Sequence, residues 1–184
     1  MATIIKTVIF ILVSAFIVWI SRSSLRDIRS HGFYRFFAWE AILALILINI
    51  DYWFVDPFSP HQITAWVLLL VSLFMVIQGF SLLRKGKTDD TRDDPALLGL
   101  EKTAELVTTG VYRYIRHPLY SSLFFLAWGT FFKYPSWVGV ALAALASISL
   151  SITARIEETE NINYWGAEYQ NYMERTKMFV PFLF

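Results

Sequence analysis

The sequence predicts an all-α, polytopic membrane protein of about five transmembrane helices, and three observations lead to this fold class. Hydrophobic residues make up 56% of the chain and charged residues only 17%, which is too apolar for an ordinary water-soluble domain of this size. Several apolar runs approach the roughly 20 residues that a helix needs to cross a bilayer. The length of 184 residues fits one compact unit, so we expect a single membrane domain over residues 1–184.

The first apolar run could be taken for a secretory signal, but no small-residue cleavage pattern follows it, so we interpret it as a retained span. The third and fifth runs contain no charged residue. The fourth is short, and Pro135 breaks the chain soon after it, so the fourth and fifth runs form either a tight helical hairpin or a re-entrant one. The predicted spans are residues 4–20, 36–55, 62–83, 118–132 and 136–154.

The distribution of lysine and arginine predicts the orientation of these spans. A path with five spans places all but two of the 16 basic residues on one side, and only Lys6 and Lys133 on the other. We therefore expect the N-terminus outside and the C-terminus in the cytosol. The polar stretches 84–117 and 155–184 then meet at the cytosolic face, apart from a solvated loop at Thr88–Pro95.

Composition also excludes several classes of function. A net charge of +1 offers no electrostatic footprint for nucleic acid, and the absence of cysteine excludes disulfides and a thiol nucleophile. His31, His61 and His117 lie far apart without metal-ligand spacing, so we expect no metal site.

The run Gly110–Tyr120 is the most informative part of the sequence. Proline disfavours a helical residue before it and suits the first position of a helix, so His117 should end an extended segment and Pro118 should open the fourth span. The free N–H groups at that helix start favour an anion, and Arg116 adds side-chain donors. The alternative is an interfacial anchor in which Arg113 and its tyrosine neighbours face the lipid headgroups.

Two further segments follow the fifth span. Glu157 and Glu158 lie where the helix dipole disfavours carboxylates, so we expect a cationic partner nearby, and Arg155 is one candidate because it is three residues from Glu158. Residues 164–181 are typical of an amphipathic, aromatic-rich helix on the membrane surface. Its rings either anchor it or wall a pocket for a cation or an adenine ring, and the candidates are Trp165, Tyr169 and Tyr172.

Taken together, these motifs resemble the signature of the isoprenylcysteine carboxyl methyltransferase and phospholipid methyltransferase superfamily. The resemblance covers roughly the C-terminal half and rests on Gly110-Val111-Tyr112, Arg116-His117-Pro118-Leu119-Tyr120, Glu157-Glu158 and Gly166…Tyr169…Tyr172…Pro181. It implies S-adenosylmethionine as methyl donor, bound on the cytosolic side by residues 105–120 and 155–181. It also implies a lipophilic or lipid-linked acceptor from the bilayer, similar to an isoprenylcysteine carboxylate or a phospholipid amine.

The resemblance carries over a set of donor-site residues by position: Gly110, Val111, Tyr112, Arg116, His117, Pro118, Tyr120, Glu157 and Glu158. The chemistry of the donor suits them, since its carboxylate fits a helix N-terminus with Arg116, its ammonium fits the glutamates, and its sulfonium fits an aromatic face. Two catalytic roles stay open: Arg155 orients an anionic acceptor, or Glu158 takes a proton from a neutral one.

Two other classes remain as alternatives. A membrane NADPH-dependent sterol or steroid reductase has a similar C-terminal architecture, but such chains are larger and carry an extra cofactor-binding loop. A transporter or other non-enzymatic membrane protein would explain the polar residues within the spans, although hydrogen bonds between helices explain most of them equally well. These residues are Glu40, Asn49, Asp51 and Gln78, of which Glu40 could border the path by which an acceptor enters.

Overall fold

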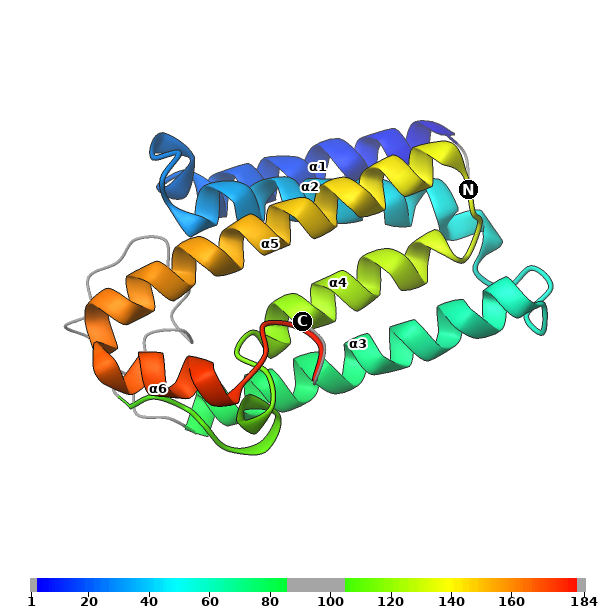
Figure 1. Cartoon of the computed structure of the whole chain (residues 1–184). Coiled ribbons are helices and arrows are strands. Elements are labelled where there is room, and N and C mark those ends of the chain that lie inside the picture. The colour runs from blue at the N-terminus through cyan, green and yellow to red at the C-terminus, as the bar shows by residue number, and fades with distance from the viewer. Residues whose placement is uncertain (1–2, 86–104, 182–184) are drawn as a thin grey trace.

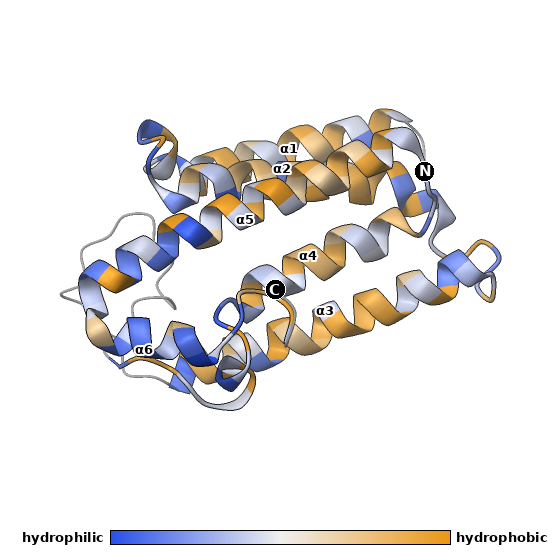
Figure 2. Ribbon diagram, viewed as in Figure 1, coloured by the Kyte–Doolittle hydropathy of each residue, from blue (hydrophilic) through white to orange (hydrophobic). Residues whose placement is uncertain are grey.

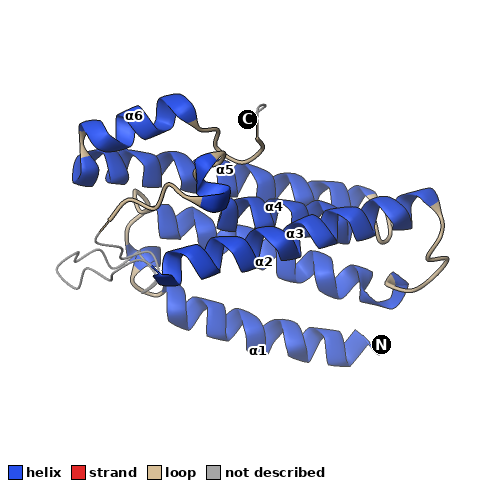
Figure 3. Ribbon diagram, turned by 90° about the horizontal axis from the view of Figure 1, so that it is seen from below, coloured by secondary structure: helices blue, strands red, loops and turns tan. Residues whose placement is uncertain are grey.

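The computed structural model describes residues 3–85 and 105–181, and in these ranges the regular structure is helical apart from one isolated β-bridge (Figures 1 and 3). The helices are α1 (Thr3–Ser21), α2 (His31–Asn49), α3 (Pro60–Lys85), α4 (Pro118–Phe131), α5 (Trp137–Trp165) and α6 (Ala167–Arg175). Short 3-10 turns lie at η1 (Ser24–Arg26), η2 (Ile50–Tyr52) and η3 (Gly110–Arg113). The predicted all-α fold class is confirmed.

Four of the described helices are long and apolar enough to cross a membrane, namely α1, α2 with η2, α3 and α5. Figure 2 shows their apolar residues in orange along the bundle, with hydrophilic residues concentrated around α6 and in the connections at the ends. Helix α4 has only 14 residues, fewer than the roughly 20 of a full span. The chain is therefore a polytopic integral membrane protein. That α4 crosses the membrane, which would make five spans, stays a prediction.

Capping residues determine where several helices start. The Ser30 side chain accepts a hydrogen bond from the Gly32 N–H, and the Ser136 side chain accepts one from the Gly139 N–H. Pro118 stands at the first position of α4, as the sequence predicts. The cap at Ser30 lets α2 begin at His31, five residues before the predicted span.

The C-terminal end of α5 differs from the prediction. The helix continues to Trp165 and breaks only at Gly166, whose φ of 59° is in the left-handed region that favours glycine. The paired glutamates therefore lie inside α5 and not at its C-terminal end. The single amphipathic helix predicted over residues 164–181 is wrong, because Gly166 divides this segment between α5 and α6.

The helices pack in two main pairs, α3 along α4 and α2 along α5, which α4 and α5 join (Figure 1). Helix α1 packs mainly against α2 and lies at the edge of the bundle (Figure 3). Small residues let the backbones approach, since the core between α2, α4 and α5 contains Ala41, Ala127, Ala143 and Ala146. A Cβ added at Gly129 would lie only 2.9 Å from the Leu69 side chain.

Polar residues of the apolar helices pair between helices. The Asn49 side chain donates to the Thr130 carbonyl over 2.8 Å, which confirms an interhelical role for this residue. Ser14 donates to Glu40 over 2.6 Å and so connects α1 to α2.

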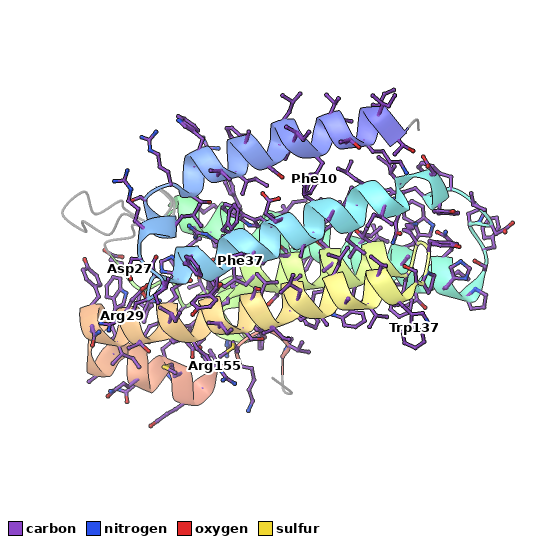
Figure 4. The ribbon with its side chains drawn as sticks, turned by 90° about the horizontal axis from the view of Figure 1, so that it is seen from above. Phe10, Asp27, Arg29, Phe37, Trp137 and Arg155 are labelled. Atoms are coloured by element: carbon purple, nitrogen blue, oxygen red, sulfur yellow. The ribbon has the colours of Figure 1, made fainter. Side chains whose placement is uncertain are left out.

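Lys133 is the largest fully buried side chain in the described structure, with 1% of its surface exposed. Its Nζ donates to Gln62 Oε1 over 3.0 Å and lies 3.1 Å from the centroid of the Trp66 ring. Trp53 adds its carbonyl as an acceptor at 3.3 Å. This cluster joins the α2–α3 and α4–α5 connections, at the end of the bundle that Trp137 marks in Figure 4.

Candidate active site

The site begins at η3, where Gly110 turns the chain. Its φ of 60° is in the left-handed region, and a Cβ added to it would lie 2.6 Å from Leu82 Cδ1. The backbone conformation favours glycine, and any larger residue would also have to displace the Leu82 side chain. The turn therefore places the following segment closely against the end of α3.

The segment after η3 pairs with the end of the chain through backbone hydrogen bonds. The Lys177 N–H donates to the Tyr114 carbonyl, and the Arg116 N–H donates to the Lys177 carbonyl, over 3.0 and 2.8 Å. The His117 N–H donates to the Met178 carbonyl over 3.2 Å. These bonds confirm that an extended segment precedes Pro118. They also confirm that the two polar stretches meet, while the loop predicted at Thr88–Pro95 lies outside the described residues.

Side chains strengthen the same junction. The Tyr172 hydroxyl donates to the Tyr112 carbonyl over 2.6 Å, which fixes α6 against η3. Ser121, in the first turn of α4, donates from its hydroxyl to the Phe179 carbonyl over 2.8 Å. Because these bonds involve buried groups, the junction is held rigidly.

Arg116 makes three contacts at this junction. Its Nε lies 2.5 Å from Glu158 Oε1, and its Nη1 donates to the carbonyls of Thr176 and Met173 over 2.5 and 3.3 Å. The cationic partner expected for the glutamates is therefore present, and for Glu158 it is Arg116. Arg155, which is labelled in Figure 4, is exposed on the surface of α5.

A cavity of about 80 Å³ that opens to solvent lies between η3, the start of α4, and the facing surfaces of α5 and α6. Aromatic residues form much of its wall, which confirms that the rings of the C-terminal segment wall a pocket. Its polar and aromatic lining consists of Tyr112, Arg116, His117, Tyr120, Glu157, Asn161, Trp165, Tyr169 and Tyr172. Its apolar edge consists of Leu83, Leu106, Val107, Pro118 and Leu119.

Glu157 gives this cavity its negative character. It lines the cavity beside the Tyr120 hydroxyl, which interacts with its carboxylate. His117 Nδ1 lies 3.9 Å from Glu157 Oε2. Burial raises the pKa of the Tyr169 and Tyr172 phenols, so these hydroxyls stay neutral at physiological pH. A carboxylate and aromatic rings in the wall of one cavity suit a positively charged ligand.

The predicted site residues fall into three groups. Six line the cavity: Tyr112, Arg116, His117, Pro118, Tyr120 and Glu157. Gly110 and Val111 lie beside it and shape the turn, lining a neighbouring groove. Glu158 is buried beside Arg116, outside the cavity wall, and its role and that of Arg155 stay predictions.

Sequence reasoning missed Asn161 and the apolar edge of the cavity. Asn161 lies one helical turn after Glu157 on the same face of α5, so its spacing from Glu157 could have predicted that it lines the cavity. The apolar residues at the end of α3 and before η3 carry no chemical signature.

The fold and the site define a class, an integral membrane protein with an aromatic, acidic cavity beside the start of a short helix. Comparison with known families makes the class specific, because the phospholipid methyltransferase family matches residues 60–167, which contain most of the cavity wall. The chain belongs to this family of membrane methyltransferases. The assignment favours neither the reductase nor the transporter alternative.

Two curated relatives are methanethiol S-methyltransferases. One, from Crocosphaera subtropica, is 27% identical over 119 residues, which cover 65% of this chain and 44% of the relative. The other, methanethiol S-methyltransferase 1 from Bradyrhizobium diazoefficiens, is 28% identical over 120 residues, which cover 64% of this chain and 39% of the relative. The matched region thus spans less than half of each relative. No solved structure matches the chain significantly.

Proposed function

We propose that this protein transfers a methyl group from S-adenosylmethionine to an acceptor that reaches the site from the bilayer. The observation that carries the proposal is the Glu157 carboxylate, which lines a cavity that is rich in aromatic residues. The family assignment supplies the reaction class.

Each charged part of this donor has a suitable neighbour in the cavity. Glu157 fits the ammonium, because a carboxylate is the strongest acceptor for a charged N–H group. The N-terminus of α4, at Leu119 and Tyr120, fits the carboxylate through its backbone N–H groups and dipole. The rings of Trp165 and Tyr169 offer faces for the adenine and the sulfonium.

The bound donor would supply a methyl group activated on its sulfonium. Residues of this chain contribute by alignment and by exclusion of water, which are the main requirements of a direct transfer. Arg116 holds η3 and α6 together and so keeps the walls of the cavity in place. His117 keeps its imidazole beside Glu157 and Glu158, at 3.9 and 3.4 Å.

The acceptor is proposed to enter along the apolar edge formed by Leu83, Leu106, Val107 and Leu119. Lipophilic carboxylates and amines fit such a path, and the names of the two relatives add small thiols to the candidates. Arg155 would orient an anionic acceptor, whereas Glu158 would take a proton from a neutral one. Turnover with one thiol, one amine and one carboxylate acceptor distinguishes these roles.

The proposed orientation places this cavity on the cytosolic side. Of the two basic residues on the other side, Lys6 pairs with Asp51 at 2.7 Å and Lys133 is buried. Neither residue therefore adds an exposed, unpaired positive charge to a loop on that side. This supports the assignment of the loops that are rich in lysine and arginine to the cytosol. A reporter inserted between Asp56 and His61 should be accessible only from outside, and cytosolic labelling would contradict the orientation.

Binding of S-adenosylmethionine to the purified protein in nanodiscs tests the proposal directly. We expect Glu157→Gln to weaken binding by about tenfold or more, because it removes the charge that faces the ammonium. Glu168→Gln is the matched control, since Glu168 is exposed on α6 and does not line the cavity. Transfer of a labelled methyl group to a lipid extract would then identify the acceptor. A wild-type protein that binds no donor would overturn the proposal.

A further inference from the structure

A second polar pair connects the start of α2 to the C-terminal part of α5, which also carries Glu157 and Glu158. His31, the first residue of α2, has its Nδ1 2.5 Å from Glu160 Oε2. The imidazole is fully buried, and its Nε2 has no hydrogen-bond partner among the described residues. Figure 4 shows the connection before α2, marked by Asp27 and Arg29, at the same end of the bundle as α6.

The three glutamates of α5 therefore have different partners. Glu158 is paired with Arg116, and Glu160 is paired with His31, each at 2.5 Å. Glu157 is the one of the three that lines the cavity.

Helix α2 also brings positive charge toward the cavity side of α5. Arg35, one turn after His31, is 5% exposed, and both side chains interact electrostatically with Glu157. The buried carboxylate thus has His117 as a neighbour from α4, and His31 and Arg35 from α2.

We propose that His31 is a positioning residue for the donor site, acting through Glu160. This inference rests on the proposed function, because the donor supplies its readout. By holding Glu160 against α2, His31 keeps that carboxylate away from the cavity and fixes the rotation of α5 about its axis. Glu157 is thereby left to face the ligand.

The physical reason is the spacing of the glutamates. Glu157 and Glu160 are three residues apart and share one face of α5, so their charges repel when neither is paired. Without His31, Glu160 would be a carboxylate in a partly buried place without a partner, which is costly. It would then compete with Glu157 for the nearby cations, His117 and Arg35.

Two substitutions at His31 test this role. His31→Leu removes the hydrogen bond to Glu160, and we expect it to weaken S-adenosylmethionine binding roughly tenfold, the effect of one lost charge-assisted hydrogen bond. His31→Asn keeps a side-chain N–H near the position of Nδ1, and we expect binding within about threefold of wild type. His61→Leu, at the opposite end of the bundle, is the matched control and should leave binding unchanged.

Removal of Glu160 tests whether His31 acts through it. In a Glu160→Ala background, His31→Leu should change donor affinity less than twofold, because the residue that it positions is gone. A full tenfold loss in that background would overturn the inference. Equal affinity of wild type and His31→Leu, with only a lower unfolding temperature, would also overturn it. If the wild type binds no donor, the proposed function itself fails.

Discussion

Arg116 and Glu158 form a buried ion pair between the segment before α4 and the C-terminal third of α5, with 2.5 Å between Nε and Oε1. Their side chains are only 10% and 9% exposed. The same guanidinium donates to two carbonyls at the end of α6, so one side chain joins three parts of the chain.

Arg116→Gln should therefore destabilise the protein. Loss of the guanidinium leaves the Glu158 carboxylate with only the His117 imidazole beside it and removes the donor of two carbonyls, so we expect the free energy of unfolding to fall by about 2–4 kcal/mol. Unfolding in mixed detergent micelles measures this change. Arg113→Gln removes an exposed arginine of η3 and should change stability by less than about 0.5 kcal/mol. Equal stability of the two variants would contradict the structure.

Gly110→Ala should also lower stability, by about 1–3 kcal/mol, because alanine is strained at a φ of 60° and its Cβ would meet Leu82. The two causes can be separated in a double-mutant cycle measured by equilibrium unfolding. In a Leu82→Ala background the same substitution should cost less, because only the backbone strain remains. An identical cost in both backgrounds would argue against the close contact.

Lys133→Met tests the buried lysine at the other end of the bundle. Methionine fills much of the same space, but leaves Gln62 Oε1 and the Trp53 carbonyl without their donor. We expect the free energy of unfolding to fall by about 1–3 kcal/mol. Lys177→Met, on an exposed residue beyond α6, serves as the control for loss of charge.

The same lysine predicts a pH dependence. Burial lowers the pKa of the Lys133 ammonium below its ordinary value of 10.5, so the folded protein loses this proton at a lower pH than the unfolded chain. Between the two pKa values the unfolded state binds more protons, and the contribution of Lys133 to stability rises with pH. The stability of wild type minus that of Lys133→Met should therefore increase with pH in alkaline buffer, because the other titrating groups are common to both proteins.

Tyr172→Phe should loosen the junction between α6 and η3. The substitution removes the hydroxyl that donates to the Tyr112 carbonyl, and we expect a loss of about 0.5–1.5 kcal/mol in stability. Because Tyr172 and Tyr112 both line the cavity, affinity for the donor should fall as well. Tyr134→Phe, near the opposite end, should leave donor affinity unchanged. A Tyr172→Phe variant with wild-type stability would show that the bond is replaced by water.

The sequence predicted those parts of the structure that depend on local rules. Pro118 opens α4 because proline suits the first helical turn, and the long apolar runs form helices because their composition allows little else in a membrane. The aromatic pattern around Tyr169 and Tyr172 allowed either a membrane anchor or a pocket wall, and packing places both rings in the wall of the cavity.

Contacts between distant residues could not be predicted in this way. The spacing rule for helices favoured Arg155 as a partner of Glu158, but packing brings Arg116 there from 42 residues away. His31 and Glu160 are 129 residues apart, and only the packing of α2 along α5 brings them together.

The backbone pairing of Tyr114 and Arg116 with Lys177 has a consequence for biosynthesis. The cavity wall is completed by Tyr169 and Tyr172 of α6, which follow all the apolar helices described, so α6 must leave the ribosome before the pocket can form. Membrane insertion of the preceding apolar helices therefore comes before assembly of the pocket. A nascent chain arrested before Lys177 would be inserted in the membrane but would lack a finished ligand site.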